Sequence, residues 1–298
     1  MKVIGSDKRI YTFSPLNKPQ AFIDLGETFW IETEDCYGGQ IQTEHDLRTH
    51  IDTSTMDAST GPIAVNGVFQ GDVIRVEILD IQVADKGIMV TAPGLGPLGD
   101  MIAEATTKII PIEDGLARFN DRICFPIKPM IGVIGVAPRE GSVHCATPGD
   151  HGGNLDTKDI TIKSSVYFPV FVDGANLAVG DLHARMGDGE LDGTGIEVAG
   201  KIKMRVSKVK CAVSLTMPIV ETDEEYLVIA SEQSFSAAAR KGIACAVKLL
   251  EKSLELSFSD AYRLVSATCD LRVSQIVNPL ITVRVAIPKS LTPPLFWT

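Results

Sequence analysis

Apolar and polar residues alternate with a period of two along most of this chain, a pattern that predicts β-strands. Apolar residues, for example, occupy every second position from Ile74 to Ile78. Pro169 interrupts one of these stretches and would suit an edge strand or a bulge. The clearest strand patterns are Gly71–Val83, Ser164–Val172, Lys201–Lys210 and Val277–Lys289.

Two stretches near the C-terminus change to the spacing of an α-helix. One is Ser231–Leu254, and the other is Ser257–Val273, for which Ser259 is the expected N-cap. We therefore expect a mainly β fold with an α+β C-terminal part. The expected division is a β-rich body over residues 1–214 and an α+β part with two helices, packed on that body, over residues 215–298.

Composition places the 298 residues among ordinary globular proteins, with 45% hydrophobic and 22% charged residues. A formal net charge of −10 argues against nucleic-acid binding, because phosphate neutralisation needs clustered Lys and Arg. No apolar run approaches the roughly 20 residues of a membrane helix, and the N-terminus does not read as a signal peptide. The six cysteines are scattered without a CxxC pair, which favours reduced thiols and a cytoplasmic location.

Residues with ionisable or polar side chains are concentrated in the segment HCATPGDHGGNLDTKDI, which runs from His144 to Ile160. Pro148 and the glycines exclude a helix, so this segment is predicted to turn. A turn of this kind contributes little to folding. Its histidines, Asn154 and Asp156 are therefore candidates for a functional site.

A second polar cluster contains Asp181 and His183, which follow the apolar sequence LAVG. In an extended strand, residues two apart point to the same side. Carboxylate oxygen and neutral imidazole are both normal zinc ligands, so the pair is a candidate metal site. A structural role for an isolated histidine of this kind is the alternative.

Glu197 lies between Ile196 and Val198 in a short apolar stretch. If its side chain is buried, desolvation would raise its pKa and suit it to act as a general base. Simple alternation favours the alternative, in which Ile196 and Val198 face the core and Glu197 faces solvent.

Asp35 ends an alternating stretch just before a Gly-Gly turn, and His45 follows shortly after it. Either residue could complete a metal shell with Asp181 and His183, although simple turn capping is the favoured explanation for an isolated Asp35 at a strand end. The acidic sequence from Asp188 to Gly193 has part of the spacing of a calcium loop. Ala199 replaces the bidentate Glu of that loop, so an EF-hand is excluded and calcium stays open only as a structural ion.

Two cysteines raise the question of thiol catalysis. Cys145 follows His144 directly, and neighbouring residues on a strand point to opposite faces. Cys36 lies beside acidic residues in another Gly-Gly turn. A catalytic thiolate needs an aligned base, so structural thiols are favoured and a cysteine-dependent amidase is kept as an alternative.

The chain resembles the acetamidase/formamidase family along nearly its whole length, and in particular its shorter, acetamidase-like branch. The wording LDGTGIE departs from the commoner family sequence. The stretches that carry the resemblance are Glu32–Ile41, Thr60–Ile81, Pro129–Pro138, Thr147–Ile160 and Val170–Gly200.

This resemblance implies a β-sandwich-containing fold, hydrolysis of small aliphatic amides to a carboxylate and ammonia, and a divalent metal, with zinc expected. On the matching motif positions, we expect Asp35, Asp181 and His183 to hold the metal and Glu197 to move the proton of the attacking water. The remaining site residues are expected to bind the oxyanion or orient the substrate, and they are Gly152, Gly153, Asn154, His144, His151 and Asp156. Of these, His144, His151 or Asp156 could also supply a further metal ligand.

Two further expectations accompany this assignment. The resemblance and the many strand edges suggest a homo-oligomer, most simply a homodimer. The non-enzymatic alternative is a metal-dependent ligand-binding β protein, which failure to release ammonia from simple amides would favour.

Overall fold

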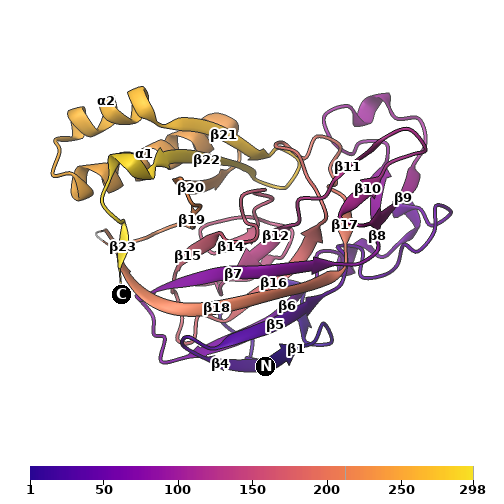
Figure 1. Ribbon diagram of the computed structural model, residues 1–298, viewed down its shortest axis with the longest axis horizontal. Coiled ribbons are helices and arrows are strands. Elements are labelled where there is room, and N and C mark those ends of the chain that lie inside the picture. The colour runs from indigo at the N-terminus through magenta and orange to yellow at the C-terminus, as the bar shows by residue number, and fades with distance from the viewer. Residues whose placement is uncertain (212, 298) are drawn as a thin grey trace.

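The computed structural model describes residues 1–211 and 213–297 of the chain. Strands account for 42% of the residues and helices for 14%, and both long helices lie late in the chain. The predicted fold class, mainly β with an α+β C-terminal part, is confirmed. Figure 1 shows the two helices at one end of the molecule and strands β8–β11 at the other.

One sheet has ten strands and runs through most of the molecule. Its long central strands pair antiparallel, with Ile202 opposite Ile81 and Val206 opposite Val76. Along its path the strands are β1 (Lys2–Ile4), β5 (Thr28–Thr33), β18 (Gly200–Cys211), β7 (Val73–Val83), β15 (Ser165–Pro169), β19 (Ile219–Glu221), β20 (Glu225–Glu232), β22 (Ile281–Pro288) and β21 (Asp270–Gln275), with β23 (Phe296–Trp297) added to β18.

A second sheet has eleven strands and carries most of the polar residues singled out above. Along its path the strands are β11 (Cys124–Pro126), β10 (Leu116–Arg118), β9 (Thr106–Glu113), β8 (Lys86–Thr91), β17 (Glu197–Val198), β16 (Leu177–His183), β12 (Met130–Gly135) and β14 (Gly152–Asn154), and β6 (Ser59–Asn66) joins β16 to β2 (Arg9–Ile10) and β4 (Ala21–Asp24). Strands β3 (Thr12–Phe13) and β13 (Val143–His144) form a separate pair.

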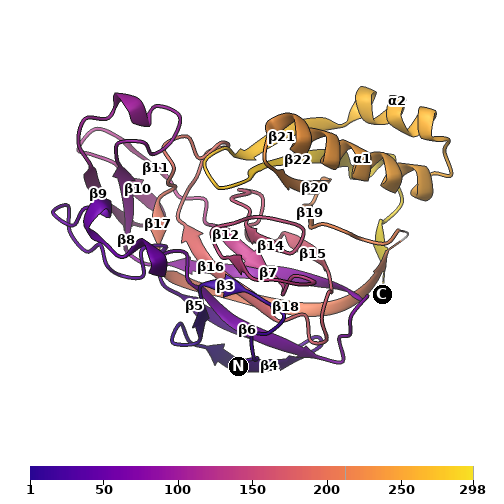
Figure 2. The same cartoon turned by 180° about the vertical axis from the view of Figure 1, so that it is seen from behind.

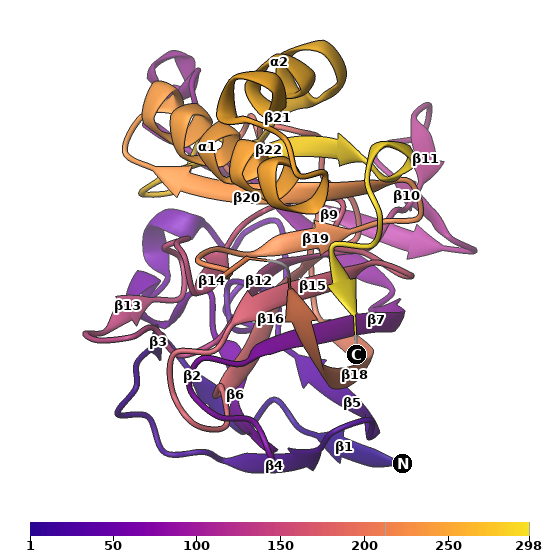
Figure 3. The ribbon, with the colours of Figure 1, turned by 90° about the vertical axis from the view of Figure 1, so that its left-hand side faces the viewer.

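Helix α1 (Phe235–Ser253) packs on β20 and β22, and α2 (Phe258–Thr268) packs on α1 and β22, as the side view in Figure 3 shows. Both helices begin at serine N-caps, because the side chains of Ser234 and Ser257 accept backbone N–H bonds. The predicted cap of the second helix, Ser259, is wrong. Ser257 is the N-cap instead, because its side chain accepts the free N–H of Asp260. The helix ends at Thr268, before β21.

The four strand patterns read from the sequence all correspond to strands, β7, β15, β18 and β22. The interpretation of Pro169 as an edge residue holds for the residue itself but not for its strand. Strand β15 lies inside the sheet, between β7 and β19. The proline is accepted there because it is the last residue of β15, where only β7 still pairs with it.

Two large hydrophobic cores stabilise these layers. The larger core fills the space between the two sheets, and the smaller one lies between α1, α2 and the β19–β22 strands. The strands of residues 215–298 nevertheless continue the ten-stranded sheet of the body through the β15–β19 pairing. The C-terminal part is thus hydrogen-bonded to the body, a feature that becomes important for the site.

Within residues 1–211 and 213–297, no helix combines the length and the apolar character that a membrane crossing requires. Figure 2 views the molecule from behind and shows β12, β14 and β16 in its middle, between the helical end and the β8–β11 strands. The candidate site lies on this central part of the second sheet.

Candidate active site and metal centre

Adjacent strands bring Asp181, His183 and Glu197 together. His183 pairs directly with Glu197 across β16 and β17, so both side chains project from the same face. The Nε2 atom of His183 lies 3.1 Å from Oε2 of Glu197 and 3.4 Å from Oδ1 of Asp181. All three residues are at most 2% exposed. The solvent-facing alternative for Glu197 is therefore excluded.

Three further side chains surround this centre. Asp156 follows β14 and places its Oδ1 atom 3.9 Å from Nε2 of His183. The side chains form two groups whose potential ligand atoms lie within 4.8 Å of one another in each group. Cys36, Asp181 and Glu197 make the first group, and Asp156, His183 and Glu190 make the second.

Several buried polar atoms at this centre have no hydrogen-bond partner among the residues that the structure describes. They are Oδ1 of Asp156, Oδ1 of Asp181, Oε2 of Glu197 and Nδ1 of His183. Buried carboxylate oxygens are costly unless they are paired or bind a metal. The combination of thiol, imidazole and carboxylate donors fits zinc, whereas calcium and magnesium prefer oxygen alone. The residues present therefore fit a bound zinc ion.

The protonation behaviour of the centre follows from burial and from its crowded charges. Burial raises the pKa of Asp156 and of Asp181 to about 6. Burial lowers the pKa of His183, but the charges of Glu197 and Asp181 outweigh it and hold that pKa well above its usual value. Burial raises the pKa of Glu197, but the charge of His183 and the surrounding hydrogen bonds outweigh burial. The pKa of Glu197 therefore lies below its usual value. The expected raised pKa of Glu197 is therefore wrong for the metal-free protein.

The backbone shapes the centre as closely as the side chains do. Gly195 N and Thr194 Oγ1 both donate to Oε1 of Glu197, at 2.8 and 2.9 Å, which leaves Oε2 facing His183. On the other side, a Cβ atom at Gly132 would lie 2.3 Å from Oδ2 of Asp181. Only glycine lets β12 approach the carboxylates so closely.

Comparison with known proteins identifies the family of this chain. The family model of the acetamidase/formamidase family matches residues 13–144 and 139–292. The chain belongs to the acetamidase/formamidase family. That family comprises hydrolases that act on amide carbon–nitrogen bonds, so the enzyme class predicted from the sequence is confirmed.

Solved structures of this family share the whole fold. The predicted acetamidase/formamidase of Thermoanaerobacter tengcongensis is 43% identical, with a TM-score of 0.95 over 97% of this chain and 96% of that one. The acetamidase of Bacillus halodurans is 41% identical, with a TM-score of 0.93 over 97% of both chains. A formamidase of Methylophilus methylotrophus is 28% identical over 277 residues, covering 70% of this chain and 68% of its own length.

The predicted site residues Asp35 and His144 lie outside both groups of potential metal ligands, and the structure gives each of them another role. The carboxylate of Asp35 accepts the backbone N–H groups of Tyr37 at 2.9 Å and Gly39 at 3.3 Å, so it caps the turn. The neighbouring Cys36 faces the centre in its place. His144 belongs to the separate β3–β13 pair, where its Nδ1 atom accepts the N–H of Ala146. His45 is exposed and is in neither group.

The Gly152-Gly153-Asn154 sequence forms β14, which pairs with β12 beside the centre. Gly152 and Gly153 have φ angles of 102° and 85°, a region that favours glycine. Asn154 is buried and its Oδ1 atom has no hydrogen-bond partner. This strand therefore leads directly from the predicted oxyanion residues to Asp156.

His151 is buried in a different environment. Its ring packs edge-on against Phe13, with a centroid distance of 5.1 Å, and its Nε2 atom has no hydrogen-bond partner. Burial lowers its pKa to about 4. His151 therefore stays neutral at physiological pH, and it belongs to neither group of potential metal ligands.

The buried neutral state of His151 predicts a pH-dependent stability. Its pKa is 6.5 in a model peptide and about 4 in the folded protein, so between these values the unfolded chain binds the additional proton. The free energy of unfolding should therefore fall as the pH falls, by about 3 kcal/mol over this range. Urea titrations of the wild type and of His151→Gln at pH 7 and pH 4.5 measure the effect, and equal pH slopes in the two proteins would contradict it.

In the acidic loop that follows His183, the three carboxylates point to different surroundings. Asp188 accepts both bonds of Arg284 Nη2 at 2.8 Å and pairs with Lys158 at 2.9 Å. Glu190 turns inward to the centre, while Asp192 stays outside both groups of potential ligands. The carboxylates of Asp188, Glu190 and Asp192 do not converge. This loop therefore does not form the calcium site that its sequence spacing allowed.

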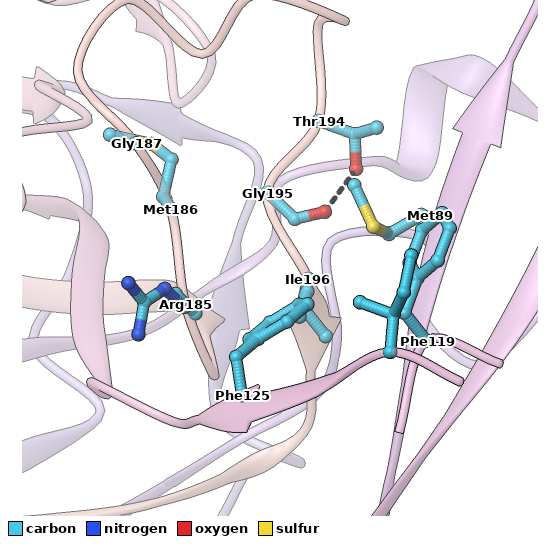
Figure 4. Close-up of a pocket in the computed structure, with 10 residues that line it drawn as sticks. Met89, Phe119, Phe125, Arg185, Met186, Gly187, Thr194, Gly195 and Ile196 are labelled. Atoms are coloured by element: carbon cyan, nitrogen blue, oxygen red, sulfur yellow. Dashed lines mark hydrogen bonds between the residues drawn. The ribbon is translucent and has the colours of Figure 1, made fainter. Parts of the chain in front are cut away.

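A cavity of about 540 Å³ lies against the chain segment that holds Glu197. In Figure 4, Thr194, Gly195 and Ile196 form one wall, and Met89, Phe119 and Phe125 face them. The opposite side of this wall is the centre itself, since a Cβ atom at Gly195 would lie 2.5 Å from Nδ1 of His183. One segment of chain thus separates an apolar cavity from the buried polar groups.

Sequence reasoning missed Glu190 as a member of the centre and considered Cys36 only as a nucleophile. Glu190 had a signal in the acidic spacing of its loop, which pointed to calcium. Cys36 had a signal in its position beside the Gly-Gly turn. Neither feature of the sequence predicts that the loops of Cys36 and Glu190 approach β16, because that contact depends on how the second sheet folds.

Proposed function

We propose that this chain hydrolyses small aliphatic amides, such as acetamide and formamide, to a carboxylate and ammonia by means of a zinc-activated water. The observation that carries the proposal is the convergence of three buried carboxylates, those of Asp156, Asp181 and Glu197, on Nε2 of His183. The matching acetamidase and formamidase names support the substrate class.

In this proposal Asp181, His183 and Asp156 hold the zinc ion, and the thiol of Cys36 favours zinc over oxygen-preferring cations. A bound zinc ion would lower the pKa of a water molecule and polarise the amide carbonyl. His183 must then be neutral, because its ring nitrogen is needed as a ligand. In this proposal Asp156 takes the place of Asp35 as a ligand, because Oδ1 of Asp35 accepts two backbone N–H groups in its own turn.

Glu197 is the proposed proton carrier. Its Oε1 atom is fixed by Thr194 and Gly195, so its Oε2 atom is presented to the centre in one orientation. This oxygen would take a proton from the attacking water and return it to the leaving nitrogen. Ammonia is a far better leaving group than the amide anion, so the returned proton is what allows the carbon–nitrogen bond to break.

The negative charge on the carbonyl oxygen needs donors without bulky side chains. We place this role on β14, where the Gly152-Gly153 backbone and the side chain of Asn154 are available next to Asp156. Small amides offer little surface for binding, so fixed donors contribute most of the orientation of the substrate.

Metal removal tests the proposal. Elemental analysis of the purified protein should show stoichiometric zinc, and chelation should reduce acetamide and formamide hydrolysis to the background of the buffer. Added zinc should restore activity, whereas added calcium should not, because Cys36 and His183 are poor calcium ligands. Circular dichroism of the chelated protein controls for unfolding.

Different outcomes favour the two alternatives. Activity that survives chelation but is lost with a thiol reagent would favour a cysteine-dependent amidase. Burial argues against this, because it raises the pKa of Cys36 well above its usual value and of Cys145 to about 12. Stoichiometric metal without ammonia release from any simple amide would favour a ligand-binding protein.

We further infer a homodimer in a reducing, cytoplasmic environment. Cys36, Cys124, Cys145, Cys245 and Cys269 are free thiols, which supports such a compartment. Exposed aromatic side chains of Phe258 and Tyr262 on α2 support an interface between copies. Sedimentation at micromolar concentration distinguishes a dimer from a monomer.

A further inference from the structure

The C-terminal hairpin formed by β21 and β22 extends from the helices toward the middle of the molecule, as Figures 1 and 2 show. Its turn, residues 276–280, contacts the second group of potential ligands. The side-chain amide of Asn278 donates to Oδ2 of Asp156 at 2.6 Å and to the backbone oxygen of Asn154 at 3.1 Å. A residue of the α+β part therefore touches a residue of the proposed metal centre.

The turn that carries Asn278 is held in one conformation by Gln275, which is fully buried. Oε1 of Gln275 accepts the backbone N–H groups of Val277 and Asn278, both at 2.8 Å. Its Nε2 atom donates to the backbone oxygen of Leu280 at 2.6 Å and to the hydroxyl of Thr282 at 2.9 Å. The amide of Asn278 is therefore preorganised before it meets the carboxylate.

The two oxygens of Asp156 have different surroundings as a result. Oδ2 is occupied by the Asn278 amide, which can only donate from its nitrogen. Oδ1 has no hydrogen-bond partner and lies 3.9 Å from Nε2 of His183. A donor on one carboxylate oxygen fixes the rotation of the group and leaves the other oxygen free to bind a cation.

The same hairpin holds the loop of Glu190. Gly189 N donates to Ser274 O at 2.8 Å, Ile276 N donates back to Gly189 O at 3.2 Å, and Arg284 of β22 binds Asp188. Glu190 itself has a φ of 49°, a strained value for a residue with a side chain, so its inward position depends on these neighbours. Two of the three residues in the second group are thus attached to the C-terminal hairpin.

We propose that Asn278 is a positioning residue for the metal centre, which locks Asp156 in the orientation that presents Oδ1 to the ion. The inference rests on the proposed function, since it assigns Asp156 as a ligand. It makes the α+β part an integral component of the site, because the body alone leaves Asp156 without its donor.

The test measures zinc affinity by competition with a chromophoric chelator, in Asn278→Ala and in the isosteric Asn278→Asp. Both variants should weaken zinc binding by about 10–100-fold, the usual cost of losing a partner of a metal ligand. Asn278→Asp keeps the shape of the side chain but exchanges the amide donor for a charged acceptor, whereas Asn278→Ala removes the donor without adding charge, so a loss in both variants assigns the effect to the donated hydrogen bond. Asn66→Ala is the matched control, because its amide also donates to a carboxylate, that of Asp24 at 2.7 Å, on the exposed surface.

Wild-type zinc affinity in Asn278→Ala, or tighter binding in Asn278→Asp, would overturn the positioning role. An equal loss in Asn66→Ala would overturn it too, since the effect would then be a general one. The unfolding midpoint of each metal-free variant shows whether it is folded, and Asn278→Ser supplies a smaller change if alanine is not tolerated. Absence of zinc binding in the wild type would instead contradict the proposed function, so the two failures are distinguishable.

Discussion

Replacement of Glu197 by glutamine should lower kcat for acetamide by roughly 10²–10⁴-fold while the protein keeps its zinc. Glutamine has nearly the shape of glutamate and can still accept the N–H of Gly195 and the hydroxyl of Thr194, so the strand should keep its position. The amide group cannot take a proton from water. The loss should therefore fall on kcat, with only a small change in KM.

Steady-state kinetics with acetamide and elemental analysis of the same preparation measure this prediction. Glu113→Gln is a suitable control, because Glu113 is an exposed glutamate on β9. Loss of zinc together with activity would reassign Glu197 from proton carrier to metal ligand. Unchanged kcat would exclude both roles.

Replacement of His183 by glutamine should remove stoichiometric zinc and reduce amide hydrolysis to background. His183 is the single nitrogen donor in the two groups of potential ligands, and Asp156, Asp181 and Glu197 all approach its Nε2 atom. Its loss also leaves these buried carboxylates without a cationic partner. We expect the metal-free variant to be destabilised by about 3–5 kcal/mol, as for other broken buried pairs.

Metal analysis, ammonia release and urea denaturation of the metal-free proteins check the three parts of this prediction. His45→Gln is the control, because His45 is exposed and belongs to neither group of potential ligands. If His183→Gln does not fold, Asp181→Asn tests the same centre with a smaller change. Full zinc occupancy in either variant would contradict the proposed ligand set.

Local patterns were a reliable guide where neighbouring residues decide the outcome. The alternation of Gly71–Val83 and the helical spacing of Ser231–Leu254 both predicted the observed elements. The pair Asp181 and His183 was also predictable, because the period of a strand places residues two apart on one face. Local ambiguity produced the errors: either Ser257 or Ser259 could begin a helix, and Asp35 could bind a metal or cap a turn.

The sequence by itself determined the fold class, the family and the β16 half of the centre, because these depend on periodicity and on contiguous motifs. Only the tertiary structure decided that Cys36 and Glu190 approach that strand and that Asn278 binds Asp156. Their approach depends on the order of strands in two sheets and on a hairpin about 100 residues further along the chain from His183. A buried centre collects its side chains from distant segments because each local segment can supply only a few, and no short pattern encodes that convergence.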